Sequence, residues 1–120
     1  MDLADDIRRF IGEHFTSPEQ LDILAFLYRN AGNGWSSDDI AARFRMSQAA
    51  VIARVEGLLQ SGLVVKAPTE PPRYWYRSRS STLHLNVDAV IQLYRLRSAD
   101  VIAEINGRPN EKNWPRPRRR

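Results

Sequence analysis

The chain has 120 residues, of which 42% are hydrophobic and 27% are charged, a composition typical of one globular domain with a single core. Its apolar runs are a few residues long, far below the roughly 20 that span a bilayer, so we expect no membrane contact. The start of the chain is acidic, unlike a signal peptide. The absence of cysteine excludes disulfides, thiolate zinc sites and cysteine nucleophiles and fits a cytoplasmic location.

The net charge of +4 is distributed unevenly. Residues 108–120 contain six basic residues and one acidic residue, a net charge of +5, whereas residues 1–107 contain 12 basic and 13 acidic residues, a net charge of −1. The charge of the whole chain is therefore no argument that its folded part binds nucleic acid. We predict a folded domain over residues 1–107 and a disordered basic tail, rich in proline and arginine, over residues 108–120.

Two helices are predicted at the start of the chain. Apolar residues recur at helical spacing over residues 2–15, which predicts a first amphipathic helix. The second helix begins after Ser17, with Pro18 at its first position and Gln20 two residues later, the pattern of a capping box. The glycines in 31–34 end this helix.

A closely spaced pair of helices follows. The third helix is predicted to begin after Ser36, with Asp39 as the acidic partner of its cap, and to stop near Arg45. The fourth is predicted to begin after Ser47 and to end at Gly62. Its apolar side consists of Val51, Val55, Leu58 and Leu59.

A short hairpin is predicted next, formed by strands over residues 63–67 and 73–77. The prolines are confined to the connection between the strands, as expected because proline lacks the N–H that a ladder needs. Tyr74 and Tyr76 should point to one face of the hairpin and Trp75 to the other. A polar linker, 77–81, leads to a last helix over residues 86–106.

The arrangement of residues 36–77 carries the most information about function. Two short helices are separated by Arg45-Met46-Ser47, with the small Ala41 where they approach each other, and Gly62 leads into the hairpin. This stretch resembles the winged helix-turn-helix of small bacterial transcription regulators of the MarR and PadR type. The resemblance implies a mainly α fold with a small β-hairpin, flanked by N- and C-terminal helices. It also implies that the second helix of the pair enters the DNA major groove while the wing contacts the backbone or the minor groove.

Carried onto this sequence, the resemblance assigns DNA contacts to the helix pair and to the wing. Gln48 is the candidate for reading a base, since glutamine pairs with adenine edges. Glu56 on the same flank would face phosphate unfavourably, and a left-handed Arg45, in place of the glycine often found in that turn, would cost roughly 1 kcal/mol. For the wing, the alternative is that its tyrosines cover the core while its arginines are solvated. The predicted contacts are Arg43, Arg45, Ser47, Gln48, Ala49, Ile52, Arg54, Lys66, Arg73, Arg77 and Arg79.

The last helix suggests a second copy of the chain. Its apolar residues repeat at alternating spacings of four and three, the period of a coiled-coil seam, and form a stripe broader than one small core requires. We therefore predict a homodimer, the alternative being a monomer that folds the whole helix in. The residues predicted for dimerisation are Val87, Ile91, Tyr94, Val101 and Ile105.

Catalytic signals are missing from the sequence. His14 and His84 are the only histidines, and no phosphate loop, nucleophile motif or metal-ligand spacing accompanies them. We expect no enzyme activity, no metal and no cofactor.

The winged unit, the basic wing and the expected dimer predict a transcriptional regulator that binds double-stranded DNA as a homodimer. The alternative is a winged-helix module that binds a protein and does not read DNA, and the apolar Ile52 and acidic Glu56 favour that alternative. The arginine-rich tail fits contact with nucleic acid, contact with an acidic protein, or plain solvation.

Overall fold

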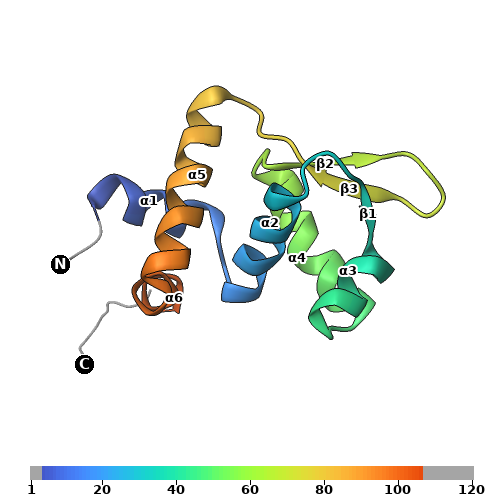
Figure 1. Cartoon of the computed structure of the whole chain (residues 1–120), viewed down its shortest axis with the longest axis horizontal. Helices are drawn as coiled ribbons and strands as arrows, with labels where there is room; N and C mark the ends of the chain where they lie inside the picture. The colour runs from blue at the N-terminus through green and yellow to red at the C-terminus, as the bar shows by residue number, and fades with distance from the viewer. Residues whose placement is uncertain (1–3, 107–120) are drawn as a thin grey trace. The chain divides into compact units, whose positions relative to one another are not determined.

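The computed structural model describes residues 4–106, which form helices and a small sheet (Figure 1). The elements in chain order are α1 (Asp5–His14), α2 (Pro18–Arg29), β1 (Trp35–Ser36), α3 (Ser37–Phe44), α4 (Gln48–Gln60), β2 (Val64–Ala67), β3 (Arg73–Tyr76), α5 (Ser81–Leu96) and α6 (Ser98–Asn106). The mainly helical class with a small antiparallel sheet is therefore confirmed. The chain divides into two compact units, one formed by residues 19–84 and the other by segments from both ends of the described chain, 4–18 and 85–106.

The helix pair α3–α4 begins at the two predicted caps. The Ser36 hydroxyl accepts a hydrogen bond of 3.1 Å from Asp39 N, and the Asp39 carboxylate accepts one of 3.2 Å from Ser36 N, which completes a capping box. The Ser47 hydroxyl accepts a 3.1 Å hydrogen bond from Ala50 N at the start of α4. Local side-chain chemistry thus fixes where both helices start.

The turn between α3 and α4 passes through a left-handed residue. Arg45 has φ 57° and ψ 45°, and Met46 N donates to Ala41 O at 3.1 Å, which closes the end of α3. This conformation brings the Cβ of an L-residue close to the following carbonyl and costs about 1 kcal/mol or more. The turn therefore keeps an arginine at the expense of stability.

The sheet has three antiparallel strands in the order β1-β3-β2. The predicted hairpin is confirmed, with Val65 opposite Trp75, and Tyr74 and Tyr76 are buried while Trp75 on the other face is half-buried. The sequence did not predict β1, in which Trp35 lies opposite Tyr74. A strand of two residues has no alternation to reveal it, since only its partner in β3 defines it.

Aromatic and apolar side chains form the core of the unit 19–84. Seven of the twelve residues of α2 are buried, and its Phe26 packs on Trp35 and Phe44 with ring centroids 4.9 and 5.7 Å away. At the far end of β3, Tyr76 Oη lies 2.8 Å from His84 Nδ1, and Tyr28 packs on the rings of both. Both α4 and the hairpin pack on this core.

The unit formed by 4–18 and 85–106 pairs α1 with α6. Arg8 Nε donates to Glu104 Oε1 at 3.0 Å, and Phe10 packs on His14 and Phe15. An exposed ion pair of this kind contributes at most about 1 kcal/mol, so apolar burial holds the unit together. Its buried apolar side chains are Phe10, Ile11, Phe15, Val87, Val90, Ile91, Val101 and Ile105.

The prediction of one continuous helix over 86–106 is wrong. The helix begins earlier, at Ser81, and it is interrupted at Arg97, after which α6 starts. Arg97 O accepts from Asp100 N and Val101 N, and the Arg97 guanidinium lies 2.7 Å from the Asp100 carboxylate in the first turn of α6. An aspartate in the first turn, Asp100, favours a new helix start, and the apolar repeat obscured that signal.

Candidate nucleic-acid interface

One flank of α4 is buried and the opposite flank is exposed. Val51, Val55 and Leu58 have no exposed surface. The residues on the outer flank are all exposed, and these are Gln48, Ala49, Ile52, Ala53 and Glu56. Ile52 keeps 39% of its surface accessible. The outer flank therefore mixes one amide and one carboxylate with a small apolar patch.

Gln48, the predicted base-reading residue, is held by a neighbour from α3. Its Nε2 donates a 2.9 Å hydrogen bond to Ser37 Oγ, and Ser37 is only 8% exposed. Sequence reasoning missed Ser37, because the two residues are 11 positions apart and meet only through the turn between the helices. Ser47, also a predicted contact, is exposed, and its hydroxyl is engaged in the cap of α4.

The predicted cations of the helix pair differ in their exposure and in their contacts with the core. Arg45 is exposed at the left-handed turn. Arg43 lies with its guanidinium carbon 5.5 Å from the centre of the Phe26 ring, a cation–π contact. Arg54 is half-buried, and its Nε is buried without a hydrogen-bond partner among the described residues. Of these three arginines, only Arg45 is exposed without a contact to the core described above.

Three of the four predicted wing cations are exposed without an ion pair among the described residues: Lys66, Arg77 and Arg79. Arg73 is exposed but engaged, because its Nη1 donates to Gly34 O at 3.1 Å and lies 4.0 Å from the Asp39 carboxylate. Arg73 therefore joins the wing to the turn before β1 and to α3.

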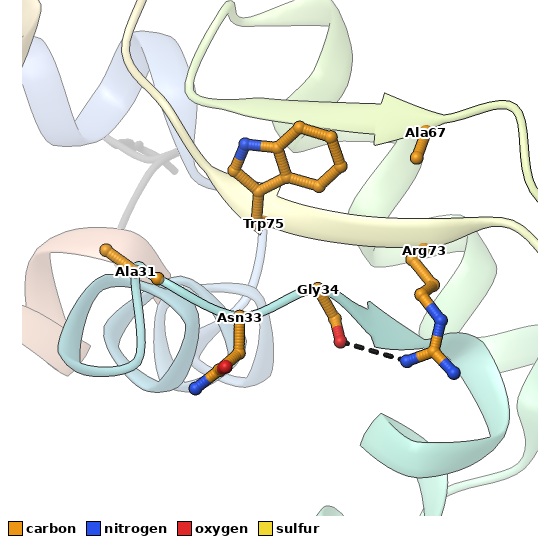
Figure 2. Close-up of a pocket in the computed structure, with 7 residues that line it drawn as sticks. Ala31, Asn33, Gly34, Ala67, Arg73 and Trp75 are labelled. Carbon is orange, nitrogen blue, oxygen red and sulfur yellow. Dashed lines mark hydrogen bonds between the residues drawn. The ribbon is translucent and has the colours of Figure 1, made fainter.

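Two hollows are lined by residues of the sheet and of the segments next to it. Figure 2 shows residues that line the first: Trp75 and Arg73 project from β3, Asn33 and Gly34 belong to the neighbouring turn, and Arg73 reaches the Gly34 carbonyl. It measures about 340 Å³ and is lined by Ala31, Gly32, Asn33, Gly34, Ala67, Arg73 and Trp75. The second measures about 430 Å³ and is lined by Leu59, Gly62, Val64, Val65, Arg77, Ser78 and Arg79. The sequence did not predict either hollow, since each combines segments distant in the chain.

Within residues 4–106, no group of three or more histidine, cysteine, aspartate or glutamate side chains is arranged to hold a metal ion. Among the same residues, no helix has the length and apolarity needed to cross a membrane.

The residues predicted for dimerisation lie in α5 and α6, and the structure buries most of them. Val87, Ile91, Val101 and Ile105 are at most 5% exposed in the single chain, and Tyr94 is half-buried. The large apolar side chains exposed in α5 are Leu85 at 68% and Leu96 at 80%. The predicted tail, 108–120, lies outside the described residues.

Comparison with known proteins agrees with this geometry. Residues 16–73, which run from the approach to α2 as far as the first residue of β3, match the model of the MarR family. No curated protein matches the chain. Among solved structures, the chain is similar to a crystal structure of a MepR mutant from a multidrug-resistant S. aureus clinical isolate. That likeness has a TM-score of 0.57 and 14% identity, and it covers 90% of this chain and 78% of that one. At this identity the likeness shows the fold alone. The predicted resemblance to winged helix-turn-helix proteins of the MarR type is thus confirmed: the family match covers residues 16–73, and the structural likeness agrees with the fold.

Proposed function

We propose that the chain is a transcriptional regulator that binds double-stranded DNA as a homodimer, with α4 in the major groove and the β2–β3 wing on the backbone. The observation that carries the proposal is the outer flank of α4. This flank begins with Gln48 and is exposed along its length, while the side chains on the opposite flank of α4 are buried in the core with no accessible surface. A rigid helix with one free flank is what a major groove admits. A regulator of this kind acts in the cytoplasm of a bacterial cell.

Phosphate contacts follow from the free cations beside that helix. Arg45 lies at the turn that precedes α4, and Lys66, Arg77 and Arg79 belong to the wing and its continuation. Because the body of the chain has a net charge of −1, these local cations rather than the overall charge supply the attraction. We assign Arg73 a structural role that supports the wing, on the basis of its bonds to Gly34 and Asp39.

The homodimer is proposed through the C-terminal helices. Four of the five seam residues are already buried within one chain, so we propose that Leu85, Leu96 and the exposed part of Tyr94 make the contact between copies. A two-fold dimer would present two copies of α4 to two half-sites of a palindromic operator.

A second candidate function is a protein-binding module. Ile52, with Ala49 and Ala53 on either side, forms an exposed apolar patch, and Glu56 extends it with a negative charge. Such a patch suits a dry protein contact better than a phosphate surface. The two candidates differ in what Gln48 and Ile52 do, which makes them separable by experiment.

The test is selection from a pool of randomised duplexes by the full chain, followed by affinity measurements across salt. The proposal expects an enriched palindromic sequence and loss of that preference in Gln48→Ala. In a full-length control, Arg116, Arg118, Arg119 and Arg120 are replaced by serine, and sequence preference should persist while overall affinity falls. If no sequence is enriched and all affinity disappears with the tail charges, the DNA function is refuted and the protein-binding module is favoured.

A further inference from the structure

Gln48 has part of its hydrogen-bonding capacity already committed. A glutamine amide offers one carbonyl oxygen and two N–H groups. One N–H of Gln48 is donated to Ser37 Oγ at 2.9 Å, while Gln48 itself is exposed at the first position of α4. The carbonyl Oε1 and one N–H are left for a ligand on the outer flank.

Ser37 is a fixed anchor for this amide. It is 8% exposed and is the first residue of α3, directly after Ser36, whose backbone and side chain are both engaged in the capping box with Asp39. The Ser37 backbone is therefore fixed at the start of α3, and its buried side chain offers a hydroxyl at a defined place. The hydrogen bond to this hydroxyl favours one position of a long, exposed side chain with three rotatable bonds before any ligand arrives.

We infer that Ser37 is a positioning residue that orients Gln48 to read adenine in the major groove, an inference that rests on the proposed function. The adenine edge there presents the N6 amino group as a donor and N7 as an acceptor. Gln48 matches it with Oε1 and the N–H on the same side of the amide. The inference requires that the N–H donated to Ser37 be the one on the opposite side of the amide, so that both contacts are made at once.

The same geometry disfavours guanine at that position. Guanine presents two acceptors, O6 and N7, in the major groove. Oε1 of an anchored Gln48 would then face O6, acceptor against acceptor, and turning the amide over would require the Ser37 hydroxyl to change from acceptor to donor. An unanchored glutamine turns freely. The Ser37 bond is therefore expected to sharpen the choice between adenine and guanine, rather than to raise affinity for DNA in general.

The hydrogen bond is tested first in the protein without DNA. The chain has four glutamines, and the side-chain amide signals of Gln48 are assigned in a ¹H–¹⁵N spectrum by their loss in Gln48→Ala. In Ser37→Ala, the Gln48 amide proton that was donated to Ser37 should exchange faster with solvent, and its chemical shift should move towards that of a free amide. Ser37→Thr keeps a hydroxyl and should preserve the signal. Unchanged Gln48 signals in Ser37→Ala would overturn the inference.

The affinity for DNA is then measured on two duplexes. The first carries the sequence enriched by the full chain. The second has guanine in place of one adenine, the one whose preference is lost in Gln48→Ala. Ser37→Ala should lower the ratio of the two affinities by about threefold to tenfold, the range expected when a flexible side chain loses its preorganised orientation. Affinity for a random duplex should stay unchanged. Ser98→Ala is the matched control, because Ser98 is also the first residue of a helix and belongs to the other unit.

The outcomes separate the inference from the proposed function. If Gln48→Ala abolishes the preference for adenine while Ser37→Ala retains the full ratio, DNA reading stands and the positioning role is overturned. If Ser37→Ala lowers the ratio equally in a Gln48→Ala background, Ser37 acts through the fold, and the inference also fails. If the full chain enriches no sequence at all, the proposed function fails and the inference falls with it.

Discussion

Gly57 of α4 lies directly against the side-chain amide of Gln20 of α2. Gln20 is 3% exposed, and its Nε2 donates a 3.1 Å hydrogen bond to the Arg54 carbonyl, one turn before Gly57. A Cβ at position 57 would overlap that nitrogen. Glycine within a helix costs up to about 1 kcal/mol relative to alanine, so its presence here is explained by the close approach of the buried amide.

Gly57→Ala is therefore expected to destabilise the protein, although alanine is the better helix former. The Gln20 amide must swing away and lose its bond to the Arg54 carbonyl, and we expect a net loss of about 1–2 kcal/mol in the free energy of unfolding. Chemical denaturation measures it. Gly32→Ala is the control, since nothing lies within 4 Å of the added carbon, and it should change stability by less than about 0.5 kcal/mol. A stabilised Gly57→Ala protein would contradict this account of the α2–α4 contact.

Arg45→Gly should raise stability and weaken DNA binding at once. Glycine adopts the left-handed conformation of this turn without strain, which should add about 1 kcal/mol to the free energy of unfolding. The same change removes an exposed cation beside α4. Arg45→Ala separates the two effects, because it removes the charge but keeps the strain. Thermal unfolding and DNA titration on each variant check the signs, and equal stability of the glycine and alanine variants would refute the strain.

The free wing cations should set the salt dependence of DNA binding. Each phosphate contact contributes about −0.9 to the slope of log affinity against log salt. Lys66→Ala and Arg77→Ala should each make the slope shallower by about that amount. Arg73→Ala should leave the slope nearly unchanged and lower stability instead, because its guanidinium is bonded to Gly34 O. Titrations between low and moderate salt distinguish the cases, and equal slope changes for Arg73 and Lys66 would contradict the division of roles.

Leu96→Lys should weaken the proposed homodimer. In a two-fold interface the substitution occurs twice, and losing two leucine contacts of about 1.5 kcal/mol each corresponds to roughly a hundredfold rise in the dimer dissociation constant. Sedimentation velocity over a concentration series measures this constant. Ile52→Lys is the matched control, because it changes an exposed apolar residue of α4 and should leave the constant unchanged. A dimer that resists Leu96→Lys but dissociates with Ile52→Lys would place the interface on the helix we assign to DNA.

The parts of the fold that could be predicted from sequence are those set by neighbours in the chain. The caps at Ser36 and Ser47 depend on backbone groups three residues away, so a short pattern reveals them. Strand β1 requires a partner in β3, and the Ser37–Gln48 bond requires the turn to bring two helices together. The engagement of Arg73 depends on Gly34, 39 positions earlier. Tertiary contacts of this kind leave no periodic signal in the sequence.

Strand β2 is an outer strand of the described sheet, and that position gives Lys66 a second consequence. The backbone N–H and C=O groups on the free side of such a strand can accept a strand from another molecule, and a charged side chain there discourages the pairing. A variant that neutralises Lys66 in order to probe DNA contacts therefore also removes a safeguard against aggregation through the sheet edge, and its solubility belongs among the quantities to be measured.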